Sequence, residues 1–216
     1  FHAYAHPDTV VTATWRIAGI TERRTGAGVP MLVVDSEAEF TDADGRLLLR
    51  NAESLVFTSL RPVPEAAPAT RAARAASDES SPAGAAIAPL ERTIALTDMV
   101  AYAGSTWDWH RLHYDPAYLE AKKLPAPVVD GQVFGALLVE AVQDDLGPDA
   151  TVREASFRFK NLVFAGETVR VSGHVVDETA VDRHRRLEIA ATVDVVGGAR
   201  PRPAATPCRV VVEVPA

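Results

Sequence analysis

Acidic and basic side chains crowd into one short stretch of the sequence. Asp108, His110 and His113 fall within six residues, and Trp107, Trp109 and Tyr114 are interspersed among them. An imidazole can take up and release a proton near neutral pH, and a nearby carboxylate can orient it. This stretch is therefore the candidate site for acid–base chemistry. The residue types alone leave an alternative open, in which Asp108 and His113 form an ion pair that only stabilises the loop.

A long apolar helix is predicted directly after this loop. Asp130 is a suitable N-cap residue, because its carboxylate can accept from free N–H groups of the first turn. Gly147-Pro148 should end the helix. Apolar residues recur between these points at steps of three and four, as one wide stripe: Val133, Phe134, Leu137, Leu138, Ala141, Val142 and Leu146. We expect this helix to form the middle of a core and to hold the loop beside it.

Composition excludes several classes of protein. The chain of 216 residues carries a formal net charge of −7, which argues against nucleic acid as a partner. Cys208 is the single cysteine, which excludes an intrachain disulfide framework and a cysteine-based metal cage. No apolar run is long enough to span a membrane and no signal peptide is visible, so we expect a cytoplasmic protein. Because the first residue is Phe1 rather than Met, we expect a trimmed or processed piece.

The first part of the chain reads as antiparallel β-structure without a helix. Strands are predicted at Val10–Ile20, Met31–Phe40 and Leu47–Phe57, and the Asp44-Gly45 step indicates a hairpin between the last two. Residues 61–88 are rich in Pro, Ala, Ser and Arg and are predicted to be a flexible linker. We therefore interpret 1–60 as an incomplete lobe whose central helix is either absent or upstream of Phe1.

Residues 89–216 contain enough elements for a complete domain. A strand is predicted at Leu90–Leu96, followed by a helix that Thr97 caps and that runs through Ala103, and by a second helix at Pro116–Ala121. After the long helix come four predicted strands: Val152–Val163, Glu167–Asp177, Arg185–Val196 and Cys208–Val214. This order predicts an α+β fold, in which an antiparallel sheet wraps around one central helix.

The loop resembles the signature of the MaoC-type dehydratases, which include the (R)-specific enoyl-CoA hydratases. That signature has an aromatic residue, a small Ser/Gly patch, Asp-x-Asn-Pro-aliphatic-His and an Asp-Pro turn. The matching residues are Tyr102, Gly104, Ser105, Asp108, Leu112, His113, Asp115 and Pro116. Three positions depart: His110 replaces Asn, Arg111 replaces Pro and Leu119 replaces a small residue. The form of the loop is similar to the two-lobed hydroxyacyl-thioester dehydratases and mesaconyl-CoA-type hydratases.

The resemblance implies a hot-dog fold, doubled here with the first lobe incomplete. It implies addition of water to, or its removal from, an acyl thioester of CoA or acyl carrier protein, without metal or cofactor. His113 would activate the water and Asp108 would share in proton transfer. The N–H of Gly131, at the start of the long helix, would stabilise the thioester oxygen. The family resemblance also implies homo- or hetero-oligomers formed through the hot-dog sheets.

Supporting roles are expected for Tyr102, Ser105, His110 and Asp130 around the catalytic pair. His110 is interpreted as either such a supporting residue or, preferably, a buried histidine with satisfied hydrogen bonds. We expect Trp107 and Trp109 to pack in the core and at its rim.

Other readings of the same residues remain. His110 and His113 have the His-x-x-His spacing of metal ligands, but a third ligand at good spacing is missing. A hot-dog thioesterase is a second possibility, with Glu140 as the helix carboxylate. A subunit that binds acyl thioesters without catalysis is a third.

Overall fold

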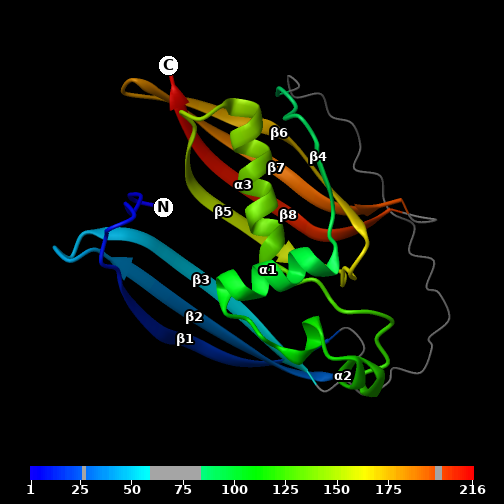
Figure 1. Ribbon diagram of the computed structural model, residues 1–216. Coiled ribbons are helices and arrows are strands. Elements are labelled where there is room, and N and C mark those ends of the chain that lie inside the picture. The colour runs from blue at the N-terminus through cyan, green and yellow to red at the C-terminus, as the bar shows by residue number, and fades with distance from the viewer. Residues whose placement is uncertain (26–27, 59–83, 198–200) are drawn as a thin grey trace. The chain divides into compact units, whose positions relative to one another are not determined.

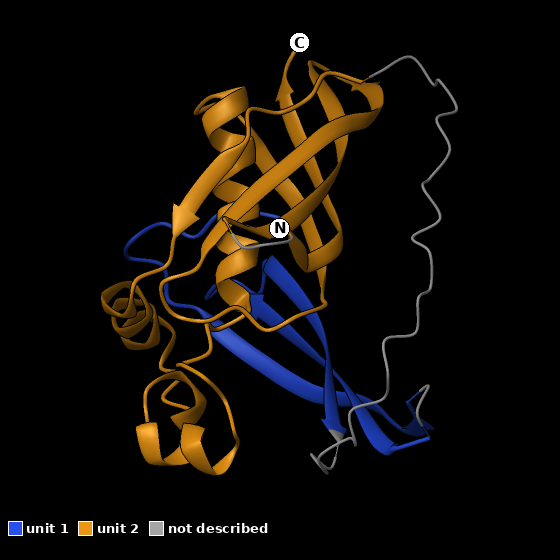
Figure 2. Ribbon diagram, turned by 90° about the vertical axis from the view of Figure 1, so that its right-hand side faces the viewer, with its two compact units in different colours: residues 1–79 blue, residues 80–216 orange. Residues whose placement is uncertain are grey.

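The computed structural model describes residues 1–25, 28–58, 84–197 and 201–216, and divides the chain into two compact units. Unit 1 spans Phe1–Glu79 and unit 2 spans Ser80–Ala216, coloured blue and orange in Figure 2. The predicted linker at 61–88 lies outside the described residues as far as residue 83. From Gly84 onward the chain is described, and Ala86 forms a β-bridge with His174 of unit 2.

Unit 1 is a three-stranded antiparallel sheet. Its strands are β1 (Thr12–Arg24), β2 (Pro30–Thr41) and β3 (Leu47–Thr58), hydrogen-bonded in the order β1-β2-β3. The predicted hairpin between β2 and β3 is confirmed: the Asp42 carboxylate accepts from the N–H groups of Asp44 and Arg46. Gly45 adopts a positive φ of 79° in this turn, a conformation that glycine reaches without steric cost.

Unit 2 contains a five-stranded antiparallel sheet in the order β4-β6-β7-β8-β5 (Figure 1). Its strands are β4 (Leu90–Thr93), β5 (Thr151–Phe159), β6 (Thr168–Val181), β7 (His184–Val196) and β8 (Arg202–Pro215). Its helices are α1 (Leu96–Thr106), the short 3₁₀ helix η1 (Arg111–His113), α2 (Pro116–Ala121) and α3 (Gln132–Leu146). None of the helices in the described parts of the chain combines the length and hydropathy that crossing a lipid bilayer requires.

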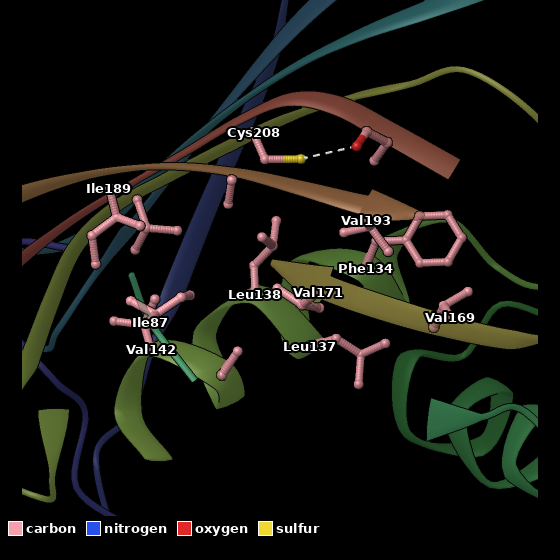
Figure 3. Close-up of a cluster of buried hydrophobic side chains, with 14 of the residues drawn as sticks. Ile87, Phe134, Leu137, Leu138, Val142, Val169, Val171, Ile189, Val193 and Cys208 are labelled. Carbon is pink, nitrogen blue, oxygen red and sulfur yellow. Dashed lines mark hydrogen bonds between the residues drawn. The ribbon is translucent and has the colours of Figure 1, made fainter. Parts of the chain in front are cut away.

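Helix α3 lies in the concave side of this sheet and forms the centre of the core (Figures 1 and 3). Leu138 and Val142 of α3 are fully buried, together with Val171 of β6 and Ile189 of β7. The predicted apolar stripe and the α+β arrangement of a sheet around one helix are thereby confirmed. Gly135 brings α3 close to the sheet, because a Cβ at this position would lie 2.6 Å from the ring of Phe157 on β5.

The predicted bounds of α1 are wrong by two residues at its N-cap and by three residues at its end. Helix α1 starts one residue before Thr97, with the extended residue Ala95 as its N-cap, and runs to Thr106 rather than Ala103. Alanine has no acceptor, and the Asp98 carboxylate instead accepts from the Ala95 N–H at 2.9 Å. Gly131 is the residue directly before α3, but the predicted capping by Asp130 is confirmed, because its Oδ1 accepts from the Gln132 N–H of the first turn at 2.9 Å.

Truncating the core helix should destabilise unit 2 strongly. We expect Leu138→Ala to lower the free energy of unfolding by about 2–5 kcal/mol, because it removes a fully buried side chain and leaves a cavity. Urea denaturation followed by circular dichroism measures this change. Val100→Ala on the exposed face of α1 is the control, with an expected change below about 0.5 kcal/mol. A loss below about 1 kcal/mol for Leu138→Ala would contradict this central role of α3.

Candidate active site

The loop between α1 and α2 is held by local hydrogen bonds from its own side chains. Trp107 ends α1 in the left-handed conformation, with φ of 61°. The Asp108 Oδ1 atom then accepts from the His110 N–H at 3.0 Å. The His110 Nδ1 atom in turn accepts from the Leu112 N–H at 3.1 Å and so caps η1. The chain after α1 is therefore turned in a defined way that carries His113 back toward Asp108.

Val128 fixes the imidazole of His113 in one tautomer. The Nδ1 atom lies 2.6 Å from the Val128 carbonyl oxygen, which can only accept, so Nδ1 carries the hydrogen. In the neutral ring, Nε2 is then left with its lone pair free to accept a proton. Val128 also donates its backbone N–H, which belongs to the preceding peptide group, to the Leu112 carbonyl at 3.1 Å. Two neighbouring residues of η1 are thus tied to one residue of the segment that leads into α3.

The free nitrogen of His113 faces the carboxylate of Asp108. The distance from Nε2 to Asp108 Oδ2 is 3.8 Å. The His113 side chain is largely buried at 13 % exposure, whereas that of Asp108 is 45 % exposed. The imidazole of His113 is therefore the base that is protected from solvent, and the carboxylate of Asp108 is the anion that is open to solvent. Such a pair can take a proton from a small molecule between them and stabilise the resulting imidazolium.

Asp130 brings a second carboxylate to the same place. One ligand atom each from Asp108, His113 and Asp130 lie within 4.8 Å of one another. The Asp130 Oδ1 atom accepts from the Gln132 N–H at 2.9 Å, which anchors the carboxylate at the start of α3. The sequence predicts only a supporting role for Asp130, whereas the structure places its carboxylate directly beside Asp108 and His113.

A small cavity of about 10 Å³ lies among these groups. Its lining consists of Met99, Tyr102, Ala103, Asp108, His113, Asp130 and Val133. A volume of this size holds about one water molecule. Burial, followed by the nearby carboxylates of Asp130 and Asp108, raises the pKa of the Tyr102 phenol above its ordinary value. Tyr102 therefore stays protonated at neutral pH and presents a hydrogen-bond donor beside two acceptors.

Gly131 lies at the positive end of α3 and directly follows Asp130, which lines this cavity. Within the parts of the chain that the structure describes, its N–H has no hydrogen-bond partner. Its missing side chain makes room for Phe159, because a Cβ at residue 131 would lie 2.6 Å from that ring. An unpaired N–H at a helix N-terminus is a favourable place for a developing negative charge.

The structure does not bring Ser105 and His110 into the cavity wall. The Ser105 hydroxyl donates to the Ala101 carbonyl within α1, at 3.0 Å, and the side chain is exposed. The interpretation of His110 as a buried histidine is wrong, because the residue is exposed. Its Nδ1 is used in the cap of η1, which requires a position at the loop surface. Its ring contacts Tyr118 edge-on, with centroids 5.6 Å apart.

The predicted core packing of the two tryptophans is also wrong. Trp107 is 80 % exposed and Trp109 is 45 % exposed, and their rings meet edge to face with centroids 6.1 Å apart. The buried face of α1 is formed by Met99 and Ala103. Trp107 would continue that face at helical spacing, but its left-handed backbone ends the helix and turns the chain away.

The two unusual loop residues His110 and Arg111 have local structural roles. Arg111 pairs with Asp115 at 2.7 Å and lies over the ring of Tyr118, 5.3 Å from its centroid. Asp115 also caps α2 by accepting from the Tyr118 N–H. These contacts stabilise the loop without entering the space between Asp108 and His113.

Asp108, His113 and Asp130 also form, among the described residues, the set of side chains close enough together to hold a metal ion. Two neighbouring ligands that bond one ion at about 2.1 Å lie about 3–3.5 Å apart. The 3.8 Å between His113 Nε2 and Asp108 Oδ2 is longer than this. These side chains would have to close in to ligate an ion, so they do not form a preformed coordination shell.

Comparison with known proteins agrees with this fold and loop. The family model described as "MaoC like domain" matches residues 78–197. The peroxisomal hydratase-dehydrogenase-epimerase of Saccharomyces cerevisiae is 31 % identical over 94 residues. That match covers 42 % of this chain and only 10 % of the yeast protein, so the chain spans about a tenth of the length of this curated relative.

Two solved structures show the fold at low sequence identity. The (R)-hydratase of A. caviae involved in PHA biosynthesis has a TM-score of 0.55 and 24 % identity, over 64 % of this chain and all of that chain. A conserved hypothetical protein of Mycobacterium tuberculosis, described as a double hot-dog fold, has a TM-score of 0.69 and 16 % identity. It matches over 99 % of this chain and 72 % of that chain.

The chain is therefore an α+β protein of the hot-dog class. It belongs to the MaoC-like domain family of hydratases and dehydratases. The predicted fold class and the resemblance drawn from the loop are both confirmed.

Proposed function

We propose that this protein adds water to a trans-2-enoyl thioester, or removes it from the corresponding (R)-3-hydroxyacyl thioester. One observation carries the proposal: the proton-accepting nitrogen of His113 faces Asp108 at 3.8 Å, beside a cavity sized for one water. Membership of the MaoC-like family and the likeness to an (R)-hydratase support the same reaction class.

The proposed step begins with His113. In the hydration direction, Nε2 takes one proton from the water, and the water oxygen forms a bond to C3 of the enoyl group. The π electrons of the C2=C3 bond shift toward the thioester carbonyl and form an enolate. The imidazolium then returns its proton to C2, so that H and OH have been added across the double bond. Asp108 lies close enough to stabilise the imidazolium between these two transfers.

The enolate oxygen is the second place where charge develops. We assign its stabilisation to the Gly131 N–H, which lies at the N-terminus of the 15-residue α3 and is unpaired within the described chain. Backbone donors at such positions act on the transition state, because the charge is larger there than in the bound substrate. Tyr102 contributes a further protonated donor near the two carboxylates.

The acyl thioester carrier is CoA or acyl carrier protein in this proposal. We also propose that the protein assembles into homo- or hetero-oligomers through its sheets. The described sheet of unit 2 ends at β4 and β5, each hydrogen-bonded to one neighbouring strand. Strands at the edge of a sheet have unpaired backbone groups that can pair with another chain.

The thioesterase alternative receives no support from the position of Glu140. This carboxylate is ion-paired with Arg92 and does not line the cavity next to His113. We therefore retain one proposed function.

A panel of enoyl-CoA thioesters of increasing acyl length tests the proposal. We expect the absorbance of the conjugated enoyl group to fall on addition of protein, with (R)-3-hydroxyacyl-CoA as the product and without release of free thiol. Release of thiol with the enoyl group intact would indicate a thioesterase. Tight binding of every substrate without turnover would indicate a non-catalytic acyl-thioester-binding subunit, and either result would overturn the proposal.

A further inference from the structure

Asp130 is the one member of the three-group cluster that the reaction proposed above does not use. It lines the same cavity as Asp108 and His113, and its carboxylate lies within 4.8 Å of the reactive atoms of both. Its position is set by α3 and not by the loop between α1 and α2, because its Oδ1 accepts from the Gln132 N–H at the start of α3. A carboxylate that is fixed to the central helix and lines a cavity for one water can contact that water.

The hydrogens of the water determine what that role can be. A water molecule has two hydrogens, and His113 Nε2 can accept one of them. Asp108 already accepts the His110 N–H at Oδ1, and its Oδ2 faces Nε2, where the positive charge of the imidazolium appears. Before the transfer, the second hydrogen can be accepted by Asp108 Oδ2 or by the other carboxylate among the described residues that line the cavity, Asp130. Once His113 is protonated, Asp108 Oδ2 faces the imidazolium, and Asp130 is then the carboxylate left to hold this hydrogen.

We propose that Asp130 is a third catalytic residue, which accepts the second hydrogen of the water while His113 removes the first. Two acceptors on one side of the oxygen direct its lone pair away from them, toward C3 of the substrate. Asp130 itself neither gains nor loses a proton in this step: the hydrogen that it binds stays on oxygen and becomes the hydroxyl hydrogen of the product. The inference rests on the proposed hydratase function and adds a specific requirement to it.

Asp130→Asn is the sharpest test of this role. Asparagine keeps an oxygen that can accept from the Gln132 N–H, so the start of α3 is preserved, but its NH₂ group can only donate to the water. We expect kcat to fall by about 10–100-fold with KM changed less than about threefold, because the water is lost and not the substrate contacts. Asp130→Ala should lose at least as much, and added formate should restore part of its kcat by supplying a small carboxylate to the emptied space.

Asp145→Asn provides a matched control on the same helix. It removes the same charge and keeps an oxygen that can accept from the Ala88 N–H, but it lies at the other end of α3. We expect its kcat to equal that of the unaltered protein. Melting temperatures of all variants show whether any loss of activity reflects a loss of folding.

The outcomes separate this inference from the proposed function. Activity of Asp130→Asn within about threefold of the unaltered protein, while Asp108→Asn and His113→Ala are inactive, would overturn the role of Asp130 and leave the hydratase intact. An equal loss in Asp145→Asn, or no effect of formate on Asp130→Ala, would also overturn it. Absence of hydration by the unaltered protein on the whole enoyl panel would instead refute the function on which the inference depends.

Discussion

His113→Ala should lower the rate of enoyl-thioester hydration by roughly 10³-fold or more, because the variant loses the group that both takes and returns the proton. Asp108→Asn should lower it by roughly 10²–10³-fold, since an amide cannot stabilise the imidazolium as a carboxylate does. Stopped-flow or steady-state measurement of the enoyl absorbance gives both rates. The effect should lie in kcat, with KM little changed, because neither side chain is proposed to bind the carrier.

His184→Ala is the control for the loss of an imidazole. This residue is exposed at the start of β7 and should leave kcat unchanged. Circular dichroism spectra should show that all three variants fold, since His113 and Asp108 are not part of the apolar core. His113→Ala also loses the hydrogen bond to the Val128 carbonyl, so its melting temperature is measured beside its rate. Rates like those of the unaltered protein in either His113→Ala or Asp108→Asn would refute the assignment of the catalytic pair.

Removing the Gly131 N–H should cost roughly 10²–10³-fold in kcat, the range typical for loss of one oxyanion donor. Gly131→Pro removes this hydrogen, and the φ of −64° at residue 131 is one that proline adopts readily. The added ring atoms would also meet Phe159, so the proline variant alone confounds two effects.

Gly131→Ala separates them, because it introduces the same contact with Phe159 but keeps the N–H. Both substitutions are best compared in a Phe159→Ala background, where the ring is gone. Phe159 is 50 % exposed, so its removal should be tolerated by the fold. We expect the alanine variant to retain most of its kcat and the proline variant to lose it. Equal rates of the two variants, with α3 intact by circular dichroism, would exclude the Gly131 N–H as the oxyanion donor.

The elements that sequence predicted best are those with a strong period. The stripe of α3 recurs over 15 residues, and every step places an apolar side chain toward the sheet, so the helix and its buried face followed directly. Helix caps are harder to predict from sequence, because they depend on backbone dihedral angles. Ala95 became the N-cap of α1 by its extended conformation, although its side chain offers no acceptor, and Asp98 supplies one from inside the helix.

The site was predictable where its members are close in sequence. The five-residue interval from Asp108 to His113 predicts that these two residues form a pair, and the structure places them 3.8 Å apart. The sequence does not predict that Asp130 lies beside this pair, because it comes 17 residues after His113 and a role as helix cap already accounts for it. The exposure of Trp107 follows from the left-handed turn at that residue, which no pattern in the sequence indicates.

Two backbone hydrogen bonds of Val128 make the proposed chemistry depend on a residue that has no reactive side chain. Its carbonyl decides which nitrogen of His113 is basic, and its N–H secures the preceding residue of η1. Neither bond involves the valine side chain, which is buried, so Val128→Ala would test packing and not these bonds. An amide-to-ester exchange at residue 128 would remove its N–H, and one at residue 129 would weaken the Val128 carbonyl as an acceptor. The proposed chemistry therefore depends partly on the path of the backbone.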